Sequence, residues 1–211
     1  MRIQICLIVM LFFTASPMLA QQGNEKEKLP EGWKMRFDQP SASLGKVMFT
    51  VNKDKYHFEV GAREAAIYYK PDMKTSDSFS LQAKFIQLQK TGHPEAYGLF
   101  IGGKNLQDPN QEYLYFLIRQ DGKYLIKRRT GSDTETVQGW TASDAVKALG
   151  EDGQSTNELT ITCSGDAVQF MANGQKLKSI PRSQLNYVEG IAGLRINHHL
   201  HLNINNFNLD Q

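Results

Sequence analysis

Histidines near the C-terminus form the most conspicuous polar cluster of the sequence. In residues 197–202 (NHHLHL), His199 and His201 are two positions apart, so on a β-strand both side chains project from the same face. Two neutral imidazoles in this arrangement can bind zinc or copper, but a metal site needs further ligands. The spacing of the sequence indicates no third ligand. We therefore expect no metal and no cofactor, and interpret both histidines as solvent-facing residues of a half-buried strand.

Aromatic and basic side chains are the second group that could do chemistry. Sugar rings stack their apolar C–H faces on aromatic rings and offer hydroxyls to arginine, asparagine or aspartate. The alternative is that strand aromatics fill a core. On the first interpretation we predict a ligand-binding surface made of Tyr113, Tyr115, Arg119, Arg128 and Trp140.

Two β-rich runs, 113–119 (YLYFLIR) and 124–129 (YLIKRR), carry most of this predicted surface. Asp121 and Gly122 lie between the runs, and this dipeptide is typical of a type I′ hairpin. In the first run the even-numbered residues are apolar and suit the space between two sheets. The odd-numbered residues mix phenols with Arg119, which suits an outer, concave face in contact with water and ligand. Across the hairpin, Arg128 is expected to reach the same region, and Trp140 to close one edge.

The rest of the chain is also dominated by strand patterns. Apolar residues alternate in 46–52, 56–60 and 79–88, and in the last of these runs a break in register is expected near Ile86. A second hairpin is expected at 158–172, followed by a turn at Asn173 and Gly174. The one helical signal, 143–150 (SDAVKALG), has a serine cap and a terminal glycine, and predicts a short connector helix. This pattern predicts an all-β fold, a two-sheet antiparallel β-sandwich of the jelly-roll type.

The N-terminus predicts export. Residues 1–20 have a positive start, an apolar run and a small-residue end, as in a signal peptide, and 21–30 form a polar leader. One domain, 31–211, follows, without a second apolar span, so a secreted or periplasmic protein is expected. The formal net charge of +2 gives no argument for nucleic acid. The domain contains a single cysteine, Cys163, whose strand register points it inward.

The order of motifs in the second half resembles the concanavalin A-like lectin/glucanase superfamily. The nearest resemblance is to small bacterial laminin-G-like and 3-keto-disaccharide-hydrolase-like domains. The motifs are 97–103 (YGLFIGG), 140–141 (WT), 156–159 (TNEL), 172–174 (ANG), 193–194 (GL) and 205–207 (NNF). The resemblance implies a jelly roll whose concave face often binds sugars. The glucanases of the superfamily carry a Glu-x-Asp-x-x-Glu strand motif, which this sequence lacks.

Three functions fit these observations. The preferred one is an exported, non-enzymatic module that binds a carbohydrate or a glycosylated surface. The first alternative is an enzyme similar to 3-keto-glycoside hydrolases, for which Glu95, Asp108 and Glu112 are the local candidates for a general acid or base. The second alternative is a laminin-G-like module that binds a protein partner.

Overall fold

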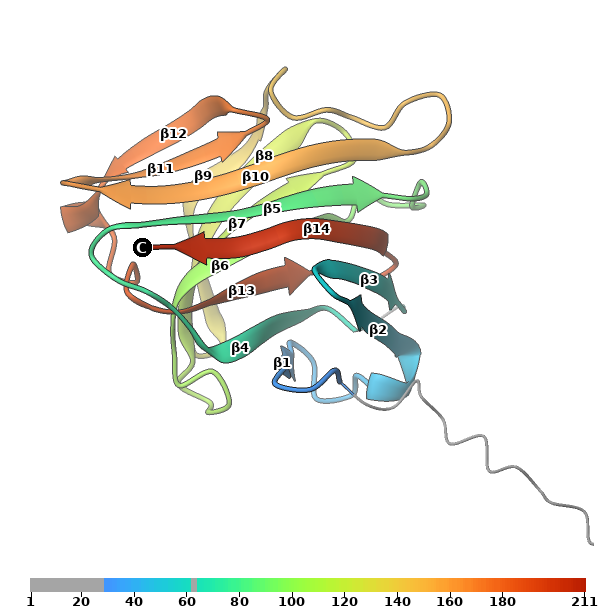
Figure 1. Cartoon of the computed structure of the whole chain (residues 1–211), viewed down its shortest axis with the longest axis horizontal. Helices are drawn as coiled ribbons and strands as arrows, with labels where there is room; N and C mark the ends of the chain where they lie inside the picture. Colours follow the sequence, from blue (N-terminus) through green and yellow to red (C-terminus); the bar gives the residue numbers. More distant parts are fainter. Residues whose placement is uncertain (1–28, 62–63) are drawn as a thin grey trace, which may run out of the picture.

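A computed structural model describes residues 29–61 and 64–211, and these residues form two seven-stranded antiparallel sheets (Figure 1). The strands of the first, sheet A, are in spatial order β1 (Lys34–Phe37), β4 (Ala66–Thr75), β13 (Gly190–Ile196), β6 (Ala96–Lys104), β7 (Glu112–Arg119), β8 (Lys123–Thr130) and β9 (Asp133–Ala142). Those of sheet B are β12 (Gln175–Pro181), β11 (Ala167–Ala172), β10 (Ser155–Ser164), β5 (Phe79–Gln87), β14 (His201–Asp210), β3 (Lys55–Val60) and β2 (Val47–Asn52).

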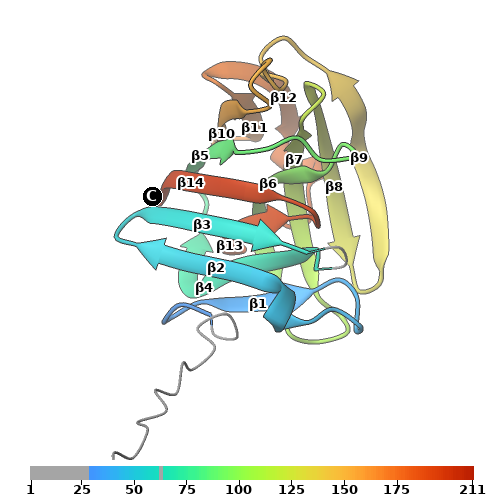
Figure 2. The ribbon, with the colours of Figure 1, turned by 90° about the vertical axis from the view of Figure 1, so that its right-hand side faces the viewer.

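The two sheets lie face to face, as the views in Figures 1 and 2 show. Buried side chains of both sheets form the main core between them. The period-two pattern of the sequence determines which side chains enter it. In β5, buried and half-buried residues alternate as the sequence predicted, but the alternation continues through Ile86 to Gln87, so the expected break in register is wrong. In β7 the even-numbered residues Leu114, Phe116 and Ile118 belong to this core. The predicted two-sheet sandwich is therefore confirmed.

The hairpin between β7 and β8 forms as predicted, but its turn type was predicted wrongly. The strands pair as far as Arg119 and Lys123, so the loop has three residues. Among these only Gly122 has a positive φ, of 75°, whereas a type I′ turn needs two. The buried Gln120 explains the difference, because its Oε1 accepts a hydrogen bond from the Thr91 amide at 3.0 Å. This bond fixes Gln120 in the loop.

The predicted connector helix at 143–150 is wrong, since this segment is a turn followed by irregular chain. Within the segment, the Val146 amide donates to the Ser143 carbonyl in a single turn, and other backbone groups bind side chains that are distant in sequence. Asn157 accepts from the Lys147 amide at 2.8 Å and donates to the Lys147 carbonyl at 2.9 Å. Asn173 donates to the Ala145 carbonyl at 2.8 Å. In the described residues, the only helical pieces are the 3₁₀ turns η2 (Leu44–Lys46) and η3 (Arg182–Gln184).

Some predictions concern the N-terminal segment. The signal peptide, 1–20, and most of the leader, 21–28, lie outside the described residues. Over 29–61 and 64–211, no helix has the length and apolar character needed to cross a membrane.

Cys163 is 1% exposed and faces the core, as its strand register predicted.

Candidate functional site

Strand β7 separates its two faces as the sequence predicted, but the outer face is not open to water. Tyr113, Tyr115 and Leu117 point away from the core between the sheets, with exposed fractions of 1%, 7% and 3%. The prediction that the two tyrosines are exposed to solvent and ligand is therefore wrong. Sheet A is therefore buried on both of its faces around β7.

A second apolar cluster accounts for this burial, and we call it the outer cluster. Its buried members are Ile67, Tyr69, Ala96, Phe100, Leu106, Tyr113, Tyr115, Leu117 and Leu125. The ring centroids of Phe100 and Tyr113 are 5.4 Å apart, and those of Tyr113 and Tyr115 are 5.6 Å apart. Leu106 joins the cluster from the loop that links β6 to β7. Burial raises the pKa of Tyr115 to about 12, so its phenol stays protonated at neutral pH.

An ion pair between a buried arginine and a half-buried aspartate borders the outer cluster. Arg195 on β13 is 6% exposed, and its Nη2 donates to Asp38 Oδ2. The second carboxylate oxygen of Asp38 lies 3.8 Å from Arg129 Nη2, and the Arg195 guanidinium lies 6.0 Å from the Tyr115 ring. Burial opposes the charged guanidinium, but the charge of Asp38 and its hydrogen bond favour it, and the pKa of Arg195 is raised overall. This pair therefore anchors the segment after β1 to sheet A.

An exposed aromatic site lies at the C-terminal end of β7. Trp140 on β9 is 39% exposed, and the Arg119 guanidinium lies 4.4 Å from its ring centroid. Asp121 holds Arg119 in place through two hydrogen bonds, of 2.7 and 2.8 Å. The Oδ2 atom of Asp121 also lies 3.5 Å from Lys123 Nζ. The hydrogen bond from Arg119, together with the charges of Arg119 and Lys123, lowers the pKa of Asp121 and keeps it ionised.

Arg128 lies on the opposite face of sheet A from the two tyrosines. It pairs across the hairpin with Leu114, which faces the main core. Its side chain donates to Glu135 at 3.0 Å and to the Gln184 carbonyl at 3.2 Å. Directly paired residues share a face, so Arg129 and Lys127 are the basic residues opposite Tyr113 and Tyr115. The prediction that Arg128 joins the tyrosine surface is therefore wrong.

The five predicted residues thus divide into three groups. Arg119 and Trp140 are in contact, Tyr113 and Tyr115 are buried in the outer cluster, and Arg128 faces the other way. Three surface depressions, of about 670, 570 and 290 Å³, have linings that include none of the five. The aromatic site is a surface patch around the exposed Trp140 side chain.

Among the acidic residues considered for catalysis, Glu95 is separated from Asp108 and Glu112. Glu95 directly precedes β6 and lies 3.2 Å from His198 Nδ1. Glu112 begins β7, and the antiparallel pairing of β6 with β7 puts it at the opposite end of the strand pair from Glu95. Asp108 lies in the loop near Glu112, where its carbonyl accepts a hydrogen bond from Arg36 at 2.9 Å. Hydrolysis by a carboxylate pair needs the two groups within about 10 Å across one substrate, and Glu95 does not share an end with the other two.

Sequence reasoning missed several residues of this surface. Asp121 was considered only as a turn residue, although it holds Arg119 against Trp140. Asp38 and Arg195 were not considered. A signal did exist for Arg195, because a single charge between the apolar residues Leu194 and Ile196 in a strand indicates either a buried ion pair or an edge position.

Comparison with known proteins identifies the architecture. No protein-family model matches the sequence, and no curated protein matches it. The carbohydrate-binding module CBM66 from Bacillus subtilis has a TM-score of 0.61 at 8% identity, over 85% of this chain and 96% of the module. A Bacillus subtilis protein of unknown function with a galectin-like fold gives 0.62 at 13% identity, over 89% and 94%. A Bacteroides ovatus mixed linkage glucan GH16 protein, in complex with a G4G4G3G product, gives 0.55 at 11%, over 85% and 95%.

These similarities show the fold. The chain has the concanavalin A-like and galectin-like β-sandwich, as the order of its motifs predicted. At these identities the similar structures carry no information about individual site residues. They include a carbohydrate-binding module as well as a GH16 protein, so the fold is compatible with both binding and hydrolysis.

Proposed function

We propose that this protein is an exported carbohydrate-binding module that contacts its ligand through Trp140 and Arg119. One observation carries the proposal. Trp140, 39% exposed, is the single exposed large hydrophobic side chain in 29–61 and 64–211, and a guanidinium holds its ring in place. An exposed tryptophan fixed by its neighbours is a binding surface that loses little side-chain entropy when a ligand arrives.

The groups around this ring suit a sugar. The indole offers an apolar surface to the C–H face of a pyranose or furanose. The ionised carboxylate of Asp121 accepts hydrogen bonds from hydroxyls, and Arg119 and Lys123 donate them. Aromatic stacking beside paired polar groups therefore favours a polyhydroxylated ligand over an apolar peptide surface.

Binding without hydrolysis is the favoured form of this function. Glu95 lies at the opposite end of the β6–β7 pair from Asp108 and Glu112, and the sequence has no Glu-x-Asp-x-x-Glu motif. No specific observation favours the enzymatic alternative or the protein-binding alternative. The similar CBM66 structure supports the choice at the level of fold only.

Trp140→Ala is expected to weaken glycan binding by about tenfold to a hundredfold. The substitution removes the apolar surface that a sugar ring would cover, which corresponds to about 1.4–2.8 kcal/mol of binding free energy. The ligand is first identified by screening the purified protein on a glycan array. Titration of the best-binding oligosaccharide into wild type and variant then measures the loss.

Trp33→Phe supplies the matched control. The chain has two tryptophans, and Trp33 is 6% exposed in the main core, so this variant leaves Trp140 as the single tryptophan reporter. In Trp33→Phe, a bound sugar should change the fluorescence of Trp140. The affinity of this variant for the sugar should equal that of wild type. Equal affinities of Trp140→Ala and wild type, or no glycan bound on the array, would contradict the proposal.

We also propose that the first twenty residues are removed on export. Their charged start, apolar run and small-residue end support cleavage near Gln21. The expected result is a secreted or periplasmic protein whose intact mass begins near that residue. Mass spectrometry of the exported fraction measures it, and a chain that still begins at Met1 there would refute processing.

A further inference from the structure

Strands β3 and β14 bring four polar side chains together on the face of sheet B that is turned away from sheet A. The even-numbered residues of β3 are buried in the core, so His57 and Glu59 point outward. Antiparallel pairing then places His201 of β14 opposite Glu59, and Asn203 opposite His57. The four positions form a two-by-two grid on neighbouring strands.

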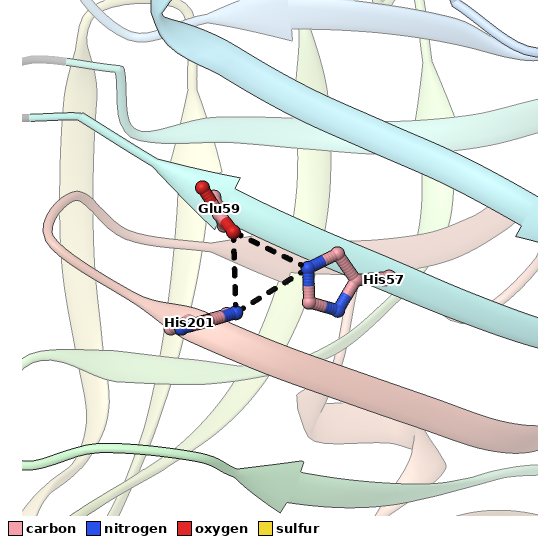
Figure 3. Close-up of side chains that lie close together, drawn as sticks. All are labelled: His57, Glu59 and His201. Carbon is pink, nitrogen blue, oxygen red and sulfur yellow. Dashed lines mark hydrogen bonds and ion pairs between the residues drawn. The ribbon is translucent and has the colours of Figure 1, made fainter.

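Three potential metal ligands of this grid point at one another (Figure 3). The Nε2 atoms of His57 and His201 are 3.3 Å apart. Glu59 Oε1 lies 3.6 Å from the first of them and 3.4 Å from the second. In a tetrahedral site with bonds of about 2.0–2.1 Å, neighbouring ligand atoms are about 3.3–3.4 Å apart. The three atoms are therefore spaced like one face of a zinc coordination tetrahedron.

Asn203 sets the tautomer that such a site requires. Its Oδ1 lies 2.7 Å from His57 Nδ1, and because a carbonyl oxygen only accepts, Nδ1 carries the proton. The lone pair of a neutral His57 is then on Nε2, the atom that faces Glu59 and His201. Ligating histidines commonly have an oxygen partner of this kind on the other ring nitrogen.

The cluster is also accessible. The side chains of His57 and His201 are each 29% exposed, and that of Glu59 is 52% exposed. A depression of about 570 Å³ includes Glu59 and His201 in its lining, and one of about 290 Å³ includes His57 and Asn203. The three ligand atoms therefore lie between two depressions, and a fourth ligand can reach them from solvent.

We propose that His57, Glu59 and His201 bind one divalent transition-metal ion, with zinc as the test case. Two imidazole nitrogens and one carboxylate oxygen suit zinc, copper or nickel and do not suit calcium or magnesium, which prefer all-oxygen sites. The fourth position is left for water or a ligand oxygen. The site is independent of Trp140, which belongs to the other sheet.

This proposal replaces the sequence-based interpretation of the histidines. His199 has a φ of 57° in the turn before β14, so it does not share a strand face with His201. The partner of His201 is His57, which is distant in sequence. The missing third ligand is Glu59.

Calorimetric titration of the purified protein, carrying no polyhistidine tag, with zinc chloride tests the site. Wild type should bind one equivalent, and calcium chloride should give no binding at the same concentrations. His57→Ala and His201→Ala should each weaken zinc binding at least tenfold. Asn203→Ala, which leaves all three ligands in place, should weaken it about tenfold to a hundredfold by releasing the His57 ring.

His199→Ala is the matched control, since it removes a neighbouring imidazole that is outside the cluster. It should bind zinc like wild type, as should Trp140→Ala, and thermal melts confirm that each variant is folded. A wild type that binds no zinc would overturn the proposal. It would also be overturned if His201→Ala bound as tightly as wild type, or if His199→Ala lost as much affinity as His201→Ala.

Discussion

Asp38→Ala is expected to lower the free energy of unfolding by about 3–5 kcal/mol. The carboxylate of Asp38 binds the guanidinium of Arg195, whose side chain is 8% exposed, and also lies 3.8 Å from Arg129. Without Asp38, a buried positive charge loses its partner and faces a second cation. Urea denaturation followed by circular dichroism measures the change.

Two further variants identify the cause of this loss. Asp77→Ala also removes a carboxylate that pairs with an arginine, Arg182, but the Asp77 side chain is 88% exposed, so the cost should stay below about 1 kcal/mol. In the double variant Asp38→Leu/Arg195→Met no charge of the pair remains buried, and most of the stability should return. If Asp38→Ala costs no more than Asp77→Ala, Arg195 is solvated in solution and the outer face of sheet A is open to water.

Local patterns were sufficient to predict the fold. The alternation in 79–88 reports a strand with one buried face, and the structure has β5 there with that alternation. Asn173 and Gly174 were predicted to form a turn, and both have positive φ, of 51° and 77°. Signals of this kind depend on neighbours in sequence, so they are readable without knowing how the strands pair.

The predicted helix at 143–150 shows where such signals fail. A serine, an acidic first turn and a terminal glycine suit a helix, but they suit a turn equally well. The outcome is decided by Asn157 and Asn173, whose side chains bind the backbone of 145 and 147. Their contribution depends on tertiary contacts that the local pattern does not contain.

The site residues were predicted less completely for the same reason. Arg119 and Trp140 belong to β7 and β9, which flank β8, and their contact required the order of those three strands. Asp38 and Arg195 are 157 residues apart, and His57 and His201 are 144 apart. Each pair depends on a long-range strand arrangement, which a single sequence does not specify by spacing.

Burial of both faces of β7 has a measurable consequence for stability. Phe116 is 0% exposed and packs 5.6 Å from the Phe170 ring of the facing sheet. Phe116→Ala is therefore expected to lower the free energy of unfolding by about 3–5 kcal/mol, as a truncation in a closed core. Tyr115 is the adjacent residue on the opposite face.

Tyr115→Ala is expected to cost about 3 kcal/mol as well, although the sequence alone places this residue on a surface open to water. The substitution leaves a cavity beside Tyr113 and removes the ring that lies 6.0 Å from the Arg195 guanidinium. Tyr115→Phe keeps the ring and should cost less than about 1.5 kcal/mol, whereas Trp140→Ala, at an exposed position, should stay within about 0.5 kcal/mol of wild type. Urea denaturation of the four variants ranks these costs. A Tyr115→Ala protein as stable as Trp140→Ala would mean that the outer cluster is solvated, and the ligand surface would then extend from Trp140 to the tyrosines.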